Sequence, residues 1–195
     1  MLKKILYKKE DILEKIGYLI PVGKTTLLHG RSGCGKTLSI IKYLIEHNEK
    51  PYFIDFDSND EYTEMDIVHI DGYKLVDELA RNKNMINELS KKTIIIDTYV
   101  KADQTLIGKD IGDIHSFVDA LTDRGSTVIV IAHTSYFSGK PAEPDVETVF
   151  ANHVACRLHL HNEVKMTKTS IYLEVEKLRG TDSKMLKNWM RDISI

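Results

Sequence analysis

The chain of 195 residues lacks the features that mark secreted and membrane proteins. Its two cysteines, Cys34 and Cys156, are too few for a disulfide framework and suit a reducing cytoplasm. Only four prolines occur, and no repeat, low-complexity tract or flexible linker is present. No apolar run could span a bilayer, and residues 5–7 are too short for a signal-peptide core. We therefore expect a cytoplasmic protein with no membrane contact.

An excess of one charge is also missing. Lys and Arg number 27 against 29 Asp and Glu, and this balance excludes a globally basic nucleic-acid binder but not a locally basic surface. Acidic residues gather in 55–71, which has no Lys or Arg, and basic residues prevail in 165–191. Such segregation is usual for a solvated surface, and it also suits an acidic face that meets a basic face of a neighbouring subunit, or nucleic acid on the basic side.

The length predicts a single domain over residues 1–195, with a lead-in helix inside 1–24 and a tail at 184–195. Strand and helix patterns alternate along it, and two strands then follow each other directly. This order predicts an α/β fold with a mainly parallel central sheet, helices on both faces and a C-terminal antiparallel extension. We expect strands at 25–29, 51–56, 93–96, 127–132, 154–160 and 170–176, and helices at 9–19, 37–47, 73–90 and 114–124.

Residues 30–37, Gly-Arg-Ser-Gly-Cys-Gly-Lys-Thr, fit the phosphate-binding P-loop pattern, with a strand before them and a helix after them. The glycines let backbone N–H groups converge on a phosphate, and the helix N-terminus adds partial positive charge. Lys36 can reach the β and γ phosphates, and Thr37 offers a hydroxyl to Mg²⁺. The expected nucleotide-binding residues are Gly30, Arg31, Ser32, Gly33, Cys34, Gly35, Lys36, Thr37 and Leu38.

Two further apolar strands end in carboxylates. Asp97 closes the run Thr-Ile-Ile-Ile-Asp, the usual form of the element whose Asp holds the Mg²⁺ shell. Asp55 and Asp57 end the strand at 51–56, and strand alternation points both to the same side. Either could orient and deprotonate an attacking water.

The ordered motifs resemble the RecA-like ATPases, particularly their KaiC/RadA and hexameric-helicase branch. The resemblance rests on residues 20–30 as the lead into the P-loop, 53–57, 128–134 and 176–183. It implies that Asp57 stands where the family places its catalytic carboxylate, usually Glu. It also implies that His133 ends the strand that senses the γ-phosphate.

The segment Glu-Lys-Leu-Arg-Gly at 176–180 is similar to the Lys-x-Arg-Gly segment of the same branch. There, Lys and Arg reach across a subunit boundary to the neighbour's γ-phosphate, roles that fall here on Lys177 and Arg179. Two residues apart, they share a face of an extended strand. The resemblance thus gives the catalytic set Asp57, Lys36, Lys177, Arg179 and His133.

As a whole, the resemblance implies a RecA-like Mg²⁺-dependent ATPase with ATP as its substrate, assembled into a ring or filament, with a hexamer expected. It implies work on DNA, single-stranded DNA above all, in helicase-like translocation or recombination, without a separate accessory domain. The loop at 134–152, with Tyr136, Phe137 and Lys140, is one candidate DNA contact, and residues 101–110 form a fainter one.

Other functions are compatible with part of the pattern. A KaiC-like ATP-dependent switch acting on a protein partner suits the acidic balance, and a small-molecule P-loop kinase suits the size. A zinc site built from His153, His159 and His161 with Cys156 is not expected, because their spacing matches no known finger.

Overall fold

The computed structural model describes residues 16–17, 19–58, 60–109, 112–135, 143–165 and 168–179. Of the helix expected at 9–19, only Ile16, Gly17 and Leu19 fall among these residues, and all three are helical. The tail expected at 184–195 lies outside the described residues.

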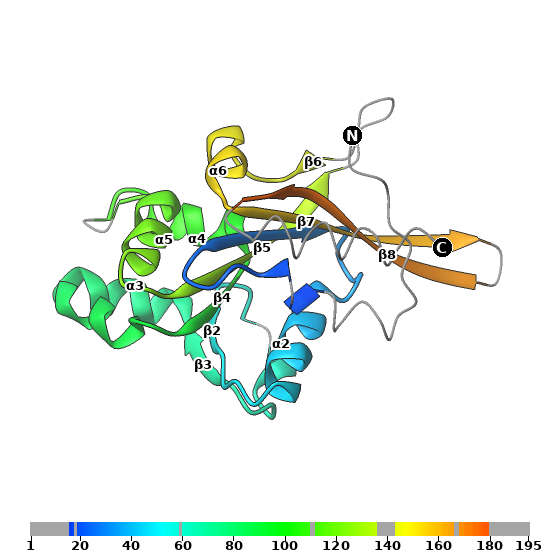
Figure 1. Cartoon of the computed structure of the whole chain (residues 1–195). Helices are drawn as coiled ribbons and strands as arrows, with labels where there is room; N and C mark the ends of the chain where they lie inside the picture. Colours follow the sequence, from blue (N-terminus) through cyan, green and yellow to red (C-terminus); the bar gives the residue numbers. More distant parts are fainter. Residues whose placement is uncertain are drawn as a thin grey trace.

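The centre of the molecule is a mixed sheet in which six strands run parallel (Figure 1). The strand order is β3-β2-β4-β5-β1-β7-β8, with β8 antiparallel to β7 and the short β6 antiparallel to β5. This confirms the predicted α/β class, the mainly parallel sheet and the antiparallel extension. The strands are β1 (Thr25–Gly30), β2 (Tyr52–Asp55), β3 (Val68–Asp71), β4 (Thr93–Asp97), β5 (Thr127–Ser135), β6 (Glu143–Pro144), β7 (Cys156–Lys165) and β8 (Lys168–Leu178).

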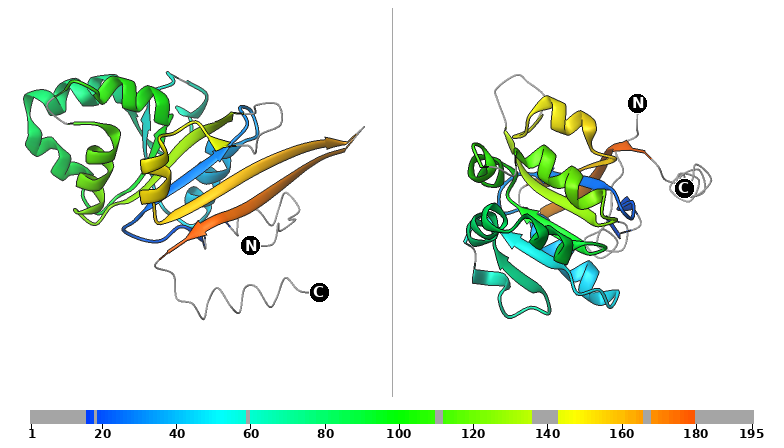
Figure 2. Two further views of the ribbon diagram at one scale, coloured as in Figure 1. Left: turned by 90° about the horizontal axis from the view of Figure 1, so that it is seen from above. Right: turned by 90° about the vertical axis from the view of Figure 1, so that its left-hand side faces the viewer.

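Helices cover both faces of the sheet and enclose two apolar cores (Figure 2). Helix α2 (Lys36–Glu46) packs on one face, and α3 (Gly72–Arg81), α4 (Tyr99–Leu106), α5 (Ile114–Thr122) and α6 (Thr148–His153) pack on the other. Successive residues of a central strand therefore enter opposite cores, as Ile94 and Ile95 of β4 do. This explains why the strand reads as an unbroken apolar run.

The helix expected at 73–90 is divided in two. Helix α3 ends at Arg81, and a 3₁₀ helix, η2, spans Lys83–Leu89. Between them Asn82 is extended, and its side-chain oxygen accepts a hydrogen bond from the backbone N–H of Asn84 at 3.2 Å. An Asn side chain that bonds its own backbone competes with helix continuation. The apolar residues of both helices are buried, as the hydrophobic spacing predicted. The prediction of one continuous helix over 73–90 was wrong.

The structure contains several helices and strands that the sequence did not predict, and some predicted strands are longer than expected. Strand β3 lies inside the acidic segment 55–71, and α4 follows β4 directly. The other 3₁₀ helix, η1, is Asp60–Tyr62. Strand β5 continues past the expected end at residue 132 and includes His133. The hairpin of β7 and β8 extends well beyond the other strands (Figures 1 and 2).

Candidate functional site

The parallel strands bring polar residues to their carboxyl edge, where each parallel strand ends. Asp71, Asp55 and Asp97 are the last residues of β3, β2 and β4, and they stand in one register row across the sheet. Gly30 ends β1, and the P-loop continues from it into α2. Open α/β sheets bind ligands outside this edge, so the fold places the sequence motifs where such a site forms.

The P-loop joins β1 to α2 through left-handed backbone. Gly33 has φ 74° and Gly35 has φ 86°, a region that L side chains rarely adopt. Gly35 precedes α2, and no side chain caps this helix end. A helix N-terminus without a side-chain cap is suited to bind an anion through its backbone N–H groups. Cys34 and Lys36 are buried in the loop, whereas Arg31, Ser32, Gly33, Gly35 and the following Leu38 are exposed.

The Lys36 ammonium folds back over the loop. Its Nζ donates to the backbone carbonyls of Gly30 and Arg31, both at 3.0 Å. Burial lowers the pKa of Lys36, and the nearby Cys34 and Asp97 oppose that shift. The loop's own carbonyls thus hold a buried cation beside the helix N-terminus.

Thr37 and Asp97 connect the start of α2 to the end of β4. The Thr37 hydroxyl donates to Oδ2 of Asp97 at 2.7 Å, and both side chains are buried. Burial raises the pKa of Asp97 to about 6, although the Thr37 hydrogen bond lowers it. Tyr62, which the sequence reasoning missed, also lies within reach of Thr37, and burial raises the pKa of its phenol. Buried oxygen ligands of this kind are suited to Mg²⁺.

Asp57 lies beyond the end of β2 rather than within it, so strand alternation does not govern its direction. Its backbone N–H donates to Oδ1 of the buried Asp55 at 2.7 Å. Its own carboxylate forms an ion pair with Lys101 of α4, with 2.6 Å between Oδ1 and Nζ. Oδ2 of Asp55 also lies 3.3 Å from Nε2 of His69, a contact that suits a structural role for Asp55. Of the two carboxylates, Asp57 is the more accessible, and Lys101 is the partner that the sequence did not reveal.

His133 stands beside the P-loop because β5 lies between β1 and β4. It is paired in register with Gly30. Burial lowers the pKa of His133, and the charge of Lys36 lowers it further. Its buried Nδ1 has no hydrogen-bond partner among the described residues. A neutral imidazole is thus held next to the loop.

Lys177 and Arg179 lie at the opposite, amino edge of the sheet. Lys177 is in register with Arg157 at the start of β7, and the backbone N–H of Arg179 donates to the carbonyl of Ala155 at 2.8 Å. The N–H of Ala155 in turn donates to the carbonyl of Thr25, the first residue of β1. The P-loop follows the last residue of β1, roughly 17 Å further along at about 3.3 Å per residue. The structure therefore does not bring these two cations to their own P-loop.

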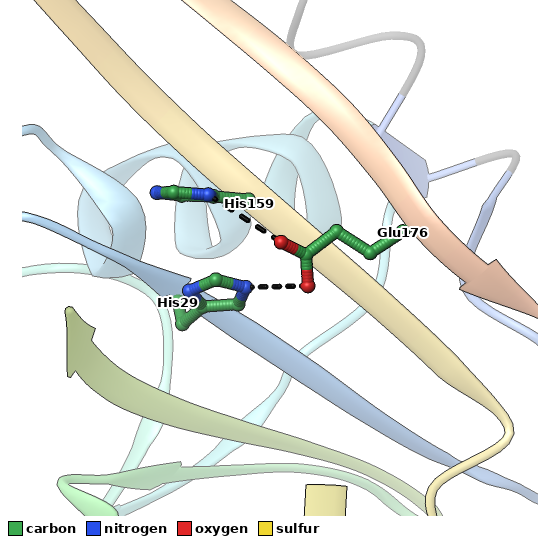
Figure 3. A group of neighbouring side chains, drawn as sticks. All are labelled: His29, His159 and Glu176. Atoms are coloured by element: carbon green, nitrogen blue, oxygen red, sulfur yellow. Dashed lines mark hydrogen bonds and ion pairs between the residues drawn. The ribbon is translucent and has the colours of Figure 1, made fainter. Parts of the chain in front are cut away.

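A polar cluster on β1, β7 and β8 escaped the sequence reasoning (Figure 3). His29 precedes the P-loop and is fully buried, and its Nε2 lies 2.9 Å from Oε2 of Glu176. His159 stacks on His29 with ring centroids 4.2 Å apart, and its Nδ1 lies 3.5 Å from the other oxygen of Glu176. These residues are far apart in sequence, so no local sequence motif predicts that they come together.

The structure brings together only part of the histidine and cysteine set considered for zinc, because His159 and His161 lie near each other and near Glu174, with potential ligand atoms within 4.8 Å, whereas His153 and Cys156 lie elsewhere. His153 pairs with Asp119 of α5 at 3.1 Å, and the thiol of Cys156 is buried in the core on the α2 side. His159 does lie close to His29 and Glu176, with potential ligand atoms within 4.8 Å. However, Nε of Arg157 lies 2.6 Å from Oε2 of Glu176, so a guanidinium already supplies the cation.

No protein-family model and no curated protein sequence matches this chain. Within the part of the chain that the structure describes, no helix is both long enough and apolar enough to cross a membrane.

Proposed function

We propose that this chain is a Mg²⁺-dependent ATPase of RecA-like type, that it assembles head to tail, and that it acts on DNA. The main support is the buried hydrogen bond between Thr37 and Asp97 at 2.7 Å. It joins the helix that follows a glycine-rich loop to the strand that ends in a carboxylate, the two elements between which a P-loop enzyme holds metal and phosphate.

The residues present fit both Mg²⁺ and a nucleotide phosphate. Thr37 and Asp97 would hold the metal, because the Thr37 hydroxyl and the Asp97 carboxylate are oxygen ligands. The pKa of Asp97 is about 6, so its carboxylate is ionised at a higher pH. The backbone of residues 30–38 would hold the phosphates at a helix end that no side chain caps. When bound, Mg²⁺ neutralises charge on the β and γ phosphates.

In this mechanism Lys36 exchanges the carbonyls of Gly30 and Arg31 for phosphate oxygens. Asp57 accepts a proton from the attacking water, and its ion pair with Lys101 must open or shift for it to do so. His133 responds to the γ-phosphate from the neighbouring strand, because it stands in register with Gly30.

Lys177 and Arg179 complete the site of another copy in this proposal. They lie at the amino edge, too far from their own P-loop. Neither forms an ion pair with a described residue, and the Lys177 ammonium donates to the backbone carbonyl of Asn152. At the carboxyl edge, Asp71, Asp55 and Asp97 form one register row, in which Asp55 and Asp97 are buried, and the exposed Asp57 follows β2. A basic edge that docks on an acidic edge makes a heterologous interface, which closes into a ring or extends as a filament.

The proposed action on DNA, single-stranded DNA above all, rests on the family resemblance, since Tyr136, Phe137 and Lys140 lie outside the described residues. One observation favours the second candidate, a KaiC-like switch acting on a protein partner. The two lysines at 101–110 are neutralised within the chain: Lys101 pairs with Asp57, and Lys109 pairs with Asp77 at 3.2 Å.

The proposal is tested by measuring ATP turnover against protein concentration, with and without single-stranded DNA. We expect specific activity to rise with concentration and with DNA, because sites are shared between copies. Turnover that rises with concentration and ignores DNA would favour the switch. Turnover independent of concentration would reject the shared site.

A further inference from the structure

Strand β8 contains a β-bulge directly before Lys177. Arg157 is in register with Lys177 and the next residue, Leu158, is in register with Val175, so Glu176 is the extra residue. A bulge bends its strand and redirects a side chain. Here it leaves both Val175 and Leu178 packed against the core on the α2 side. It therefore sets the direction of Glu176 and of the residues that follow it.

The carboxylate of Glu176 is held by three side chains. Its Oε2 lies 2.9 Å from Nε2 of His29 and 2.6 Å from Nε of Arg157. Its Oε1 lies 3.5 Å from Nδ1 of His159. Burial by itself raises the pKa of Glu176, but the hydrogen bonds from His159 and His29 and the nearby positive charge of Arg157 hold the pKa far below its usual range. Glu176 is thus an ionised group fixed between β1 and β7 (Figure 3).

Three positively charged residues lie close to this carboxylate in sequence or in register. Arg157 and Lys177 are register partners, and Arg179 follows two residues later. Burial lowers the pKa of Lys177, and Arg179 and Arg157 lower it further, so the cations repel one another. Glu176 binds Arg157, and the Lys177 ammonium donates a hydrogen bond to the backbone carbonyl of Asn152, whereas Arg179 is exposed. Lys177 would therefore exchange this carbonyl for a phosphate oxygen, and Arg179 could bind a phosphate directly.

The same contact ties β8 to the P-loop strand. Nδ1 of His29 lies 2.9 Å from the hydroxyl of Thr134 on β5, so the imidazole is held at both nitrogens. The residue after His29 is Gly30, whose carbonyl accepts from Lys36. The attachment point of Glu176 is therefore a buried ring with a fixed orientation.

We infer that Glu176 is a positioning residue, which uses His29 and Arg157 to hold Lys177 and Arg179 in the orientation that serves the neighbouring copy. The inference rests on the proposed function, because it concerns the two cations assigned to the shared site. Glu176 touches neither nucleotide nor water in this role.

The test compares Glu176→Gln with Glu174→Gln in the full chain. Glu174 is the matched control, because it lies two residues earlier on β8 and bonds a histidine, His161, at 2.7 Å, but not His29. We expect Glu176→Gln to lower ATP turnover about 10-fold or more, as loss of a supporting partner commonly does. Its affinity for a nucleotide analogue should stay within about twofold of wild type, as should the turnover of Glu174→Gln, because neither change touches the P-loop.

A mixing experiment separates positioning from a folding defect. Lys36→Ala subunits have a defective P-loop but intact Lys177 and Arg179, so they can serve a Glu176→Gln neighbour. An equal mixture should recover activity toward a limit of about a quarter of wild type, the share of head-to-tail contacts that pair an intact P-loop with an intact donor. A mixture of Lys36→Ala with Arg179→Ala should behave in the same way.

Three outcomes would overturn the inference. Glu176→Gln could keep wild-type turnover, or it could lose nucleotide affinity together with turnover. It could also stay inactive with Lys36→Ala while Arg179→Ala is rescued. If Arg179→Ala is not rescued either, the shared site of the proposed function has failed, and the role of Glu176 fails with it.

Discussion

The two edges of the sheet hold their functional side chains in different ways. At the carboxyl edge Lys36, Thr37 and Asp97 are 5%, 7% and 8% exposed, and they bond to the loop or to each other. At the amino edge Lys177 is half-buried and Arg179 is exposed, and neither forms an ion pair with a described residue. The carboxyl edge is held by contacts among buried side chains, whereas at the amino edge the Lys177 ammonium donates to the backbone carbonyl of Asn152 and Arg179 is exposed.

The largest effect is expected from Arg179→Ala. If this residue acts on the neighbour's phosphate, its loss should lower turnover by about 10³–10⁵-fold, as for an arginine finger. Nucleotide affinity should not change, because Arg179 lies at the other edge. Steady-state kinetics and equilibrium binding measure the two quantities. A variant that loses affinity in dilute, unassembled protein would show that the edges are not independent.

Lys36→Ala should lower turnover by about 10²–10³-fold, the usual cost of removing one preorganised electrostatic contact. Nucleotide affinity should fall in the same variant, which distinguishes it from Arg179→Ala. Lys42→Ala is the matched control, because Lys42 is an exposed lysine of the same helix. Equal losses in both variants would contradict a specific role for the loop lysine.

Asp97→Asn should stabilise the metal-free protein while lowering Mg²⁺-dependent turnover. Burial raises the pKa of Asp97 from 3.8 to about 6, so folding favours the protonated carboxyl, and this contribution to stability is lost as the pH rises through 6. An amide avoids the buried charge and can still accept from Thr37. We expect a gain on the order of 1–3 kcal/mol in the free energy of unfolding at pH 8.

Urea unfolding with a chelator present, at pH 8 and again at pH 4, measures this gain. It should nearly vanish at pH 4, where the carboxyl is mostly protonated in the folded chain. A gain of the same size at both pH values would rule out ionisation of Asp97 as its cause.

The smallest effect is expected from Lys101→Met, which removes the exposed partner of Asp57. Exposed ion pairs contribute little, so turnover should change by no more than about threefold, and upward if Asp57 is the base. Steady-state kinetics of Lys101→Met and of the wild type measure this change. Asp57→Asn with wild-type turnover would remove Asp57 from the mechanism.

The sequence predicted those parts of the molecule that depend on neighbours along the chain. The P-loop follows from glycines at the left-handed positions 33 and 35, and β4 follows from an unbroken apolar run. The α/β class followed from the order of such segments. These features need only local spacing. The structure confirms the α/β class and strand β4, and it shows positive φ at Gly33 and Gly35.

The contacts that escaped prediction join residues distant in sequence. Lys101 meets Asp57, and Glu176 meets His29 across 147 positions. A one-residue bulge at Glu176 leaves no periodic signal, because alternation on either side of it looks regular. The break between α3 and η2 involves a hydrogen bond to the side chain of Asn82. The spacing of hydrophobic residues carries no information about such a bond.

The separation of the two edges gives any assembly of this chain a direction. A linear stack of n copies that share sites in the proposed way contains n − 1 complete sites, since one terminal P-loop and one terminal Arg179 have no counterpart. A closed ring completes all n. Turnover per chain would therefore report stack length in short assemblies and become constant on closure, so kinetics alone could count subunits.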